Sequence, residues 1–159
     1  MNKDNLMRVL LVEDDLGDAR LVQAMLPETD AVKYEVTRTA RLSEAISCLN
    51  EGPVDIVLLD LDLPDSQGID TVAALCKAAP DVPVIVLTGY ADENTKVAAV
   101  LGGVQDFLIK GRTPADLLSR VLCHAVERQR TEGRLRESER FLRATLEALT
   151  NNGSIPYGT

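Results

Sequence analysis

The stretch DIVLLDLDLPD, residues 55–65, is highly informative about the fold, because it is a short apolar run that ends abruptly in carboxylates. A second run of the same kind, VLLVEDD at residues 9–15, precedes it. Short apolar runs rich in Val, Ile and Leu and bounded by polar residues are typical of buried strands. Carboxylates at the ends of two buried strands serve a core poorly, but together they can form a cation site.

The rest of the chain alternates such runs with helical patterns. Buried strands are predicted at residues 7–12, 56–59, 84–87 and 107–109. A weaker alternating stretch at 34–37 is predicted to be a shorter strand nearer an edge, with Glu35 and Thr37 on its more exposed side. Helices are predicted at 19–26, 42–49, 69–79 and 93–101, each followed by Pro or Gly.

This order of strand and helix, repeated five times, predicts an α/β fold. Right-handed crossovers then give a doubly wound, five-stranded parallel sheet with helices on both faces. Ligands of such open sheets bind outside the carboxyl ends of the strands, where the direction of winding reverses. The polar residues at or just after these ends are Glu13, Asp14, Asp60, Thr88 and Lys110. The sequence therefore predicts one functional site at this edge of the sheet.

After Pro114 the pattern stays helical to about Leu149, so the last helix is expected to extend beyond the domain. We expect three parts: a domain at 1–126, an extended helix at 127–150 and a disordered tail at 151–159. Steps of three and four give a heptad seam that is apolar at its ends and polar in its middle. The seam runs through Leu117, Val121, His124, Arg128, Thr131, Leu135, Ser138, Leu142, Thr145 and Leu149.

We interpret this seam as a weak parallel coiled coil, which would form a homodimer through the C-terminal helix; a solvated single helix is the alternative. Gly133 counts against a stiff rod, because glycine costs about 1 kcal/mol in a helix interior.

Composition narrows the classes of function. The chain has 159 residues, of which 45% are hydrophobic, enough for one well-buried core and an appendage. A net charge of -8 argues against a nucleic-acid-binding face, which needs clustered Lys and Arg. Three widely spaced cysteines and one histidine fit reduced thiols better than disulfides or a zinc site. With no long apolar run, the chain is predicted to have no membrane span or signal peptide and to be cytoplasmic.

The predicted site suggests phosphoryl chemistry. Carboxylates clustered at Glu13, Asp14 and Asp60 repel one another unless a cation or proton intervenes, and oxygen ligands favour Mg²⁺. Asp60 could then act as a nucleophile toward a phosphoryl group and form an aspartyl phosphate. Lys110 would add a positive charge and Thr88 a hydroxyl donor for the phosphoryl oxygens.

Four segments together resemble the receiver domain of bacterial two-component response regulators: LVEDD at 11–15, LLDLDLP at 58–64, VLTG at 86–89 and DFLIK at 106–110. The resemblance spans roughly residues 6 to 126. It implies a flavodoxin-like sheet of strand order 2-1-3-4-5 and a histidine kinase or histidine phosphotransfer protein as the phosphoryl donor. The resulting signalling switch would act through the face around the fourth helix and fifth strand and through the C-terminal helix.

The resemblance also implies roles for individual residues. Asp60 is the phosphoacceptor; Glu13 and Asp14 form the acidic pair; Asp62 lends a backbone carbonyl to Mg²⁺; Thr88 and Lys110 hold the phosphoryl group; Thr88 and Phe107 move inward as the switch.

Two positions depart from the family pattern. Gly111 follows Lys110 where the family usually has Pro after a cis peptide bond; a non-proline cis bond costs about 2.5–4 kcal/mol, so this loop is expected to be trans and freer. Glu13 replaces the commoner Asp, which lengthens that arm by a methylene and makes a water-mediated metal contact plausible.

Several alternatives stay open. Residues 135–143 resemble linkers into sensory, kinase or diguanylate cyclase domains, which would make the chain the N-terminal receiver of a larger signalling protein rather than a complete dimeric regulator. The pair Asp60 and Asp62 also fits the Asp-x-Asp start of haloacid-dehalogenase-like phosphatases, but that scheme gives Glu13 and Asp14 no role. A third alternative is a degenerate receiver that acts only by binding.

Overall fold

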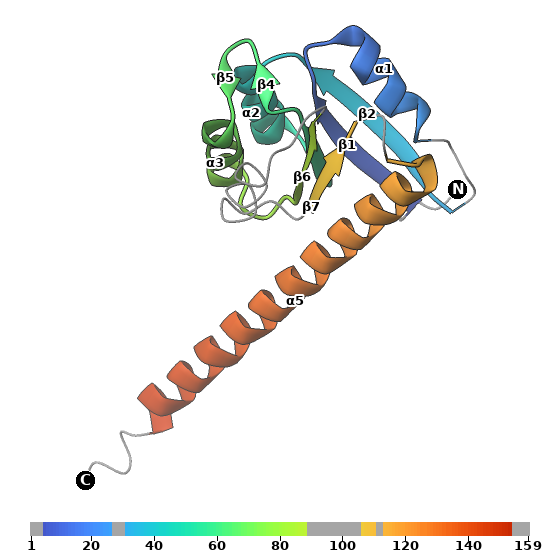
Figure 1. The fold of residues 1–159 in the computed structure, drawn as a ribbon. Helices are drawn as coiled ribbons and strands as arrows, with labels where there is room; N and C mark the ends of the chain where they lie inside the picture. The colour runs from blue at the N-terminus through green and yellow to red at the C-terminus, as the bar shows by residue number, and fades with distance from the viewer. Residues whose placement is uncertain (1–4, 27–30, 89–105, 111–112, 154–159) are drawn as a thin grey trace. The chain divides into compact units, whose positions relative to one another are not determined.

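The computed structural model describes residues 5–26, 31–88, 106–110 and 113–153 (Figure 1). Five parallel strands of this part form one sheet in the order β2-β1-β3-β6-β7. They are β1 (Leu6–Val12), β2 (Lys33–Thr39), β3 (Ile56–Leu59), β6 (Val84–Thr88) and β7 (Asp106–Ile109). Numbered without the small hairpin β4-β5, this is the order 2-1-3-4-5, so the predicted flavodoxin-like α/β fold is confirmed.

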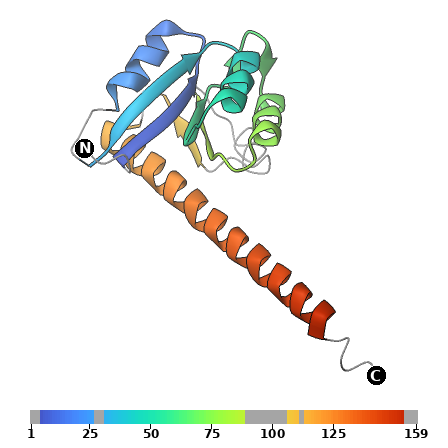
Figure 2. The same cartoon turned by 180° about the vertical axis from the view of Figure 1, so that it is seen from behind.

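Helices cover both faces of the sheet, as the alternating pattern predicts. They are α1 (Leu16–Ala24), α2 (Leu42–Glu51), α3 (Ile69–Ala78) and α5 (Ala115–Gly153). Figure 1 and, from behind, Figure 2 show α1 on one side of the sheet and α2 with α3 on the other. The helix predicted at 93–101 lies outside the described residues.

Successive residues of β1 point to opposite faces, which builds two separate apolar clusters. Val9 and Leu11 pack with α1 and with the first turns of α5. Leu10 and Val12 pack with α2 and α3. Because both faces are covered, β1 and β3 are apolar along almost their whole length, and polar residues begin only where these strands end.

Strand β2 differs from its prediction in length. It pairs with β1 over seven residues, from Lys33 to Thr39, and is therefore as long as its neighbour. Its predicted place at the sheet edge is confirmed, and so is the exposure of Glu35 and Thr37.

A small antiparallel hairpin that the sequence did not predict follows β3. Its strands are β4 (Asp62–Leu63) and β5 (Ser66–Gln67). The hairpin closes at Gly68, whose amide donates to the carbonyl oxygen of Leu61 at 2.8 Å. Gly68 has a φ of 66°, a conformation that side chains disfavour, so a glycine suits this corner.

The chain divides into two compact units, Met1–Val126 and Glu127–Thr159, and α5 contributes to both. In the first unit α5 buries Leu118, Leu122, Ala125 and Val126. Leu117, next to Leu118 on this helix, is 40% exposed. The helix continues to Gly153, so residues 151–153 are helical. The expectation that the disordered tail begins at residue 151 was wrong.

Two further findings concern the cysteines and the length of the apolar helices. Cys48, Cys76 and Cys123 are free thiols, each half-buried. Among the described residues, no helix combines the length and the apolar character that crossing a membrane requires.

Candidate functional site

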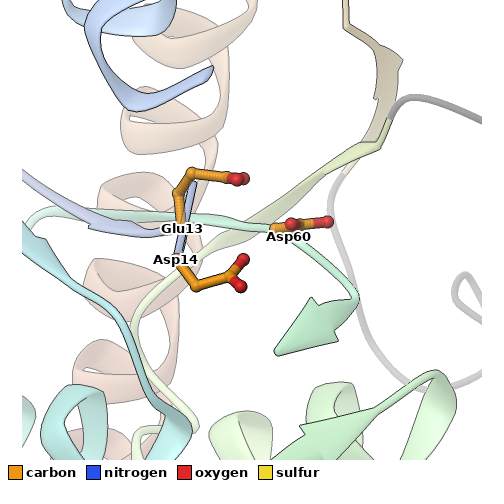
Figure 3. Close-up of side chains that lie close together, drawn as sticks. All are labelled: Glu13, Asp14 and Asp60. Carbon is orange, nitrogen blue, oxygen red and sulfur yellow. The ribbon is translucent and has the colours of Figure 1, made fainter. Parts of the chain in front are cut away.

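Three carboxylates lie together at the carboxyl edge of the sheet. Glu13 and Asp14 follow β1 and Asp60 follows β3; these strands are neighbours whose last paired residues are Val12 and Leu59. Adjacent parallel strands that end in register must place their next residues side by side. One carboxylate oxygen from each of the three acids lies within 4.8 Å of the others, as Figure 3 shows. Glu13 is 2% exposed and Asp60 7%, whereas Asp14 is exposed.

Lys110 neutralises part of this charge from the end of β7. Its Nζ lies 2.6 Å from Glu13 Oε2 and 3.4 Å from Asp60 Oδ2. It also donates to Asp18 Oδ2 at 3.1 Å, which brings the first turn of α1 into the site. Asp18 was not predicted as a site residue, because nothing in the sequence distinguishes it from other acids in a first helical turn.

The electrostatics of the cluster favour added positive charge. The pKa of Glu13 is raised to about 7, mainly by burial; the hydrogen bond from Lys110 lowers this pKa, and neighbouring Asp60 contributes to raising it. Burial alone would lower the pKa of Lys110, but its contacts with Glu13, Asp60 and Asp18 prevail and raise it, so the amine stays protonated. Because burial is the largest cause of the shift and Asp60 adds to it, a cation bound beside these carboxylates would favour the ionised form of Glu13.

The backbone of the acidic pair is held from the edge strand. Arg38 on β2 donates through Nε to the carbonyl oxygen of Glu13 at 3.0 Å and through Nη2 to that of Asp14 at 3.1 Å. The amide of Glu13 donates to the carbonyl oxygen of Thr39 at 2.9 Å. These contacts continue the β1-β2 pairing beyond the last strand residue. Arg38 was not predicted, since side-chain contacts to carbonyl oxygens leave no sequence motif.

The loop after Glu13 is fixed as well. The Asp15 amide donates to Glu13 Oε1 at 3.2 Å, and the Asp15 carboxylate accepts from the Asp18 amide at 2.9 Å as the N-cap of α1. An N-cap of this kind satisfies an amide that the helix itself cannot pair. The same turn therefore orients both Glu13 and the start of α1, where Asp18 lies.

Asp62 lies beside Asp60. Its amide donates to Asp60 Oδ1 at 3.3 Å, while its exposed side chain accepts from Gln67 Nε2 at 3.2 Å. The structure thus brings the Asp62 backbone to the site and leaves its side chain on the surface. A metal-binding role for the Asp62 carbonyl stays a prediction.

Asp65 at the tip of the hairpin caps another helix. Its two carboxylate oxygens accept from the amides of Leu42 at 2.8 Å and Ser43 at 3.1 Å, at the start of α2. Hydrogen bonds from Ser43 and then Leu42 lower the pKa of this exposed carboxyl. The loop that carries Asp60 is therefore anchored to α2.

The two predicted switch residues lie on neighbouring strands. Thr88 is the last residue of β6 and pairs with Ile109, but its side chain lies outside the described residues. Phe107 on β7 is half-buried and packs against the cluster under α2 and α3. Gly111, and with it the peptide bond after Lys110, also lies outside the described residues.

Fold and site together define a flavodoxin-like α/β protein with an acidic, lysine-containing pocket at the carboxyl end of its sheet. Residues 9–122 match the response regulator receiver domain family, and the chain belongs to that family. Members of this family are regulatory phosphoacceptors.

Known proteins illustrate the range of the family. The chain is 34% identical over 123 residues to the cell cycle transcriptional regulator CtrA of Caulobacter vibrioides; the match covers 77% of this chain and 51% of CtrA. The chain thus spans about half the length of that relative. The Mn(2+)-bound form of the response regulator Rcp1 is similar in structure, with a TM-score of 0.61, 30% identity and coverage of 73% of this chain and 89% of Rcp1. So is the phosphorylated cyanobacterial phytochrome response regulator RcpA, with a TM-score of 0.62, 26% identity and the same two coverages, 73% and 89%.

Proposed function

We propose that the chain is a signalling switch that accepts a phosphoryl group on Asp60 from a partner histidine kinase or histidine phosphotransfer protein. The observation that carries this proposal is the contact of Lys110 with both Asp60 and Glu13 at the carboxyl edge of the sheet. A nearly buried carboxylate beside a fixed ammonium is an acceptor site where negative charge on incoming oxygens can be neutralised.

The donor set fits Mg²⁺. Glu13, Asp14 and Asp60 supply only oxygen ligands, and their shared negative charge exceeds what Lys110 neutralises. In our proposal these three side chains and the backbone carbonyl of Asp62 hold the ion, which when bound neutralises charge on the phosphoryl oxygens. The similarity to Rcp1, whose structure is a Mn(2+)-bound form, supports a divalent cation at this place.

The transfer itself needs no general base, because the Asp60 carboxylate is already a nucleophile. One carboxylate oxygen of Asp60 attacks phosphorus and forms a new O–P bond. The N–P bond of the donor phosphohistidine breaks, and the imidazole nitrogen leaves with the electron pair. The product is an aspartyl phosphate, whose oxygens Lys110 and Thr88 would contact. The similarity to RcpA, which was crystallised phosphorylated, supports this chemistry.

The conformational response would begin at Thr88 and Phe107. Thr88 would follow the phosphoryl group, and Phe107 would move inward behind it, changing the face around β7, the helix predicted at 93–101 and α5. The energy for the change comes from contacts that the phosphoryl group makes in only one of the two states. Phe107 has no hydroxyl group, so packing alone would stabilise its inward position.

The proposed setting is a cytoplasmic protein that does not itself bind nucleic acid, in keeping with its charge of -8 and its free thiols. We place the chain as the N-terminal receiver of a larger signalling protein; a complete dimeric regulator is the alternative. Any kinase or cyclase output would then lie outside this chain.

The test is intact-mass spectrometry after incubation with acetyl phosphate and Mg²⁺. We expect one phosphoryl adduct on the parent protein, none on Asp60→Asn, and an undiminished adduct on Asp55→Asn, which makes the same substitution just before the other end of β3. An adduct that survives in Asp60→Asn would refute the assignment of the acceptor. Continuous hydrolysis of a generic phosphate ester would instead indicate a phosphatase. The absence of an adduct on every variant would indicate a module that acts only by binding.

A further inference from the structure

The second unit of the chain exposes a set of large apolar side chains. Five residues of α5 between 134 and 150 have 58–72% of their surface exposed. They are Leu135, Phe141, Leu142, Leu146 and Leu149. Single exposed apolar residues are ordinary, but five on four turns of one helix indicate a surface that another chain covers.

All five fall on one side of the helix when the heptad is placed with Leu135, Leu142 and Leu149 at position a. Leu146 is then at e and Phe141 at g, the positions that flank a coiled-coil seam. The d positions are Ser138 and Thr145, which are small and polar. The placement thus gives three leucine layers separated by two weak layers.

We propose that a second copy of this chain covers this face, as a parallel two-stranded coiled coil over residues 134–150. The occupant is identified by the flanking positions, because in a parallel pair the g residue of one helix meets the e residue five positions later in its partner. Arg134 would meet Glu139 of the second copy, which is an opposite-charge pair, and Phe141 would meet Leu146, which is an apolar pair. Both flanks of the seam are therefore complementary to themselves under two-fold symmetry.

The same residues disfavour an antiparallel pair. In that arrangement a positions pack against d positions, so Leu135, Leu142 and Leu149 would face Ser138 and Thr145 instead of one another. Positions e would also face e, which brings the acidic side chain of Glu139 toward other e residues of its partner rather than toward Arg134.

A shifted parallel register is also worse. Leucines at d would place Leu146 at a, but Glu139 would be at a as well and would face its own copy across the seam, a like-charge contact in the interface core. Phe141 would then be at position c, outside the seam. The register with leucines at a is the one that covers all five apolar residues and keeps the charges at the rim.

The test measures molecular mass in solution by sedimentation equilibrium over a range of concentrations, with no phosphoryl donor present. We expect a reversible dimer whose dissociation constant rises by about tenfold or more in Leu142→Asp. Ala144→Asp is the matched control, since it places the same residue two positions away at c, outside the seam, and should leave dimerisation nearly unchanged. A parent protein that stays monomeric, or two variants that behave alike, would overturn the proposal.

Orientation is tested by reversing charges. Arg134→Glu and Glu139→Arg should each weaken the dimer, and the double variant should recover most of the parent affinity. Residues five apart do not face each other within one helix, so recovery reports a contact between copies. A double variant as weak as the single ones would refute the parallel register. Because neither experiment involves Asp60, the outcome is independent of whether the first unit accepts a phosphoryl group.

Discussion

Arg38 Nε donates a hydrogen bond to the carbonyl oxygen of Glu13 at 3.0 Å, so a side chain on the edge strand holds the first residue of the acidic pair by its backbone. A second bond from the same guanidinium reaches the carbonyl oxygen of Asp14 at 3.1 Å. The planar guanidinium matches this pair of acceptors, and a lysine could not reproduce both contacts with the same geometry. Arg38 thus fixes where the two carboxylates begin.

Replacing Arg38 with Ala should therefore weaken Mg²⁺ binding while leaving every proposed ligand in place. Loss of a residue that orients ligands typically costs about 10–100-fold in metal affinity, and we expect the lower end because Arg38 is half-exposed. Calorimetric titration with Mg²⁺ gives the affinity. Arg41→Ala, which removes the same charge from an exposed position nearby, should bind Mg²⁺ like the parent. Equal losses in both variants would mean that Arg38 acts only through long-range charge.

Lys110→Gln should destabilise the protein when divalent cations are removed by a chelator. The change leaves nearly buried Glu13 and Asp60 without their shared counter-charge, at a cost of about 2 kcal/mol, below the value for a fully buried pair because Asp18 and Asp14 are open to water. Chemical denaturation followed by circular dichroism measures the loss. Mg²⁺ should restore more stability to this variant than to the parent, because in the variant the ion does not compete with the Lys110 ammonium for the carboxylates. Lys77→Gln on the exposed face of α3 is the control and should stay within about 0.5 kcal/mol.

Asp65→Asn should lower the thermal midpoint at neutral pH, because an amide can offer only one acceptor atom to the two amides at the start of α2. Those bonds lower the pKa of Asp65 below its ordinary value of 3.8, so the stabilisation is complete above that value and is lost as pH falls through the folded-state pKa. The difference in midpoint between parent and variant should shrink in acid. Glu51→Gln at the other end of α2 serves as the comparison, and a difference that is constant with pH would contradict the capping role.

Gly133→Ala should stabilise the helix of the second unit by about 1 kcal/mol. A methyl group added at Gly133 meets no described atom within 4 Å apart from its chain neighbours and the nearby backbone of its own helix, and the position lies at f, opposite the proposed seam. Thermal unfolding of the helical signal by circular dichroism measures the gain. Ala144→Gly, on an exposed position of the same helix, should give a loss of stability of similar size. No change of stability in either variant would indicate that this segment does not unfold as a helix.

The fold and the centre of the site were predictable because both follow from strand ends. Runs such as 9–15 and 55–65 mark where buried strands stop, and parallel pairing brings those ends together whatever the details of the loops. Glu13, Asp14, Asp60 and Lys110 therefore meet as predicted.

What the sequence could not indicate are contacts made by residues with no motif of their own. Arg38 and Asp18 are ordinary charged residues on a strand and on a helix. Their roles depend on contacts made in the folded protein, from Arg38 to the Glu13 carbonyl oxygen and from Lys110 to Asp18. The hairpin β4-β5 is too short to carry a periodic pattern, and the cap from Asp65 to α2 joins residues more than twenty positions apart. The predicted end of the last helix at residue 150 was wrong. Asn151, Asn152 and Gly153 favour turns, but a helix that is already formed extends more easily than a new one begins.

The Lys110 amine has three hydrogens and three acidic neighbours, at 2.6 Å, 3.1 Å and 3.4 Å. Any further oxygen that approaches Nζ must take the place of one of them. Asp18 is the most exposed of the three and is the neighbour that water replaces most readily. An oxygen that binds Lys110 beside Asp60, at the end of β3, would therefore displace Asp18 from the amine. The first turn of α1 would then lose its contact with Lys110.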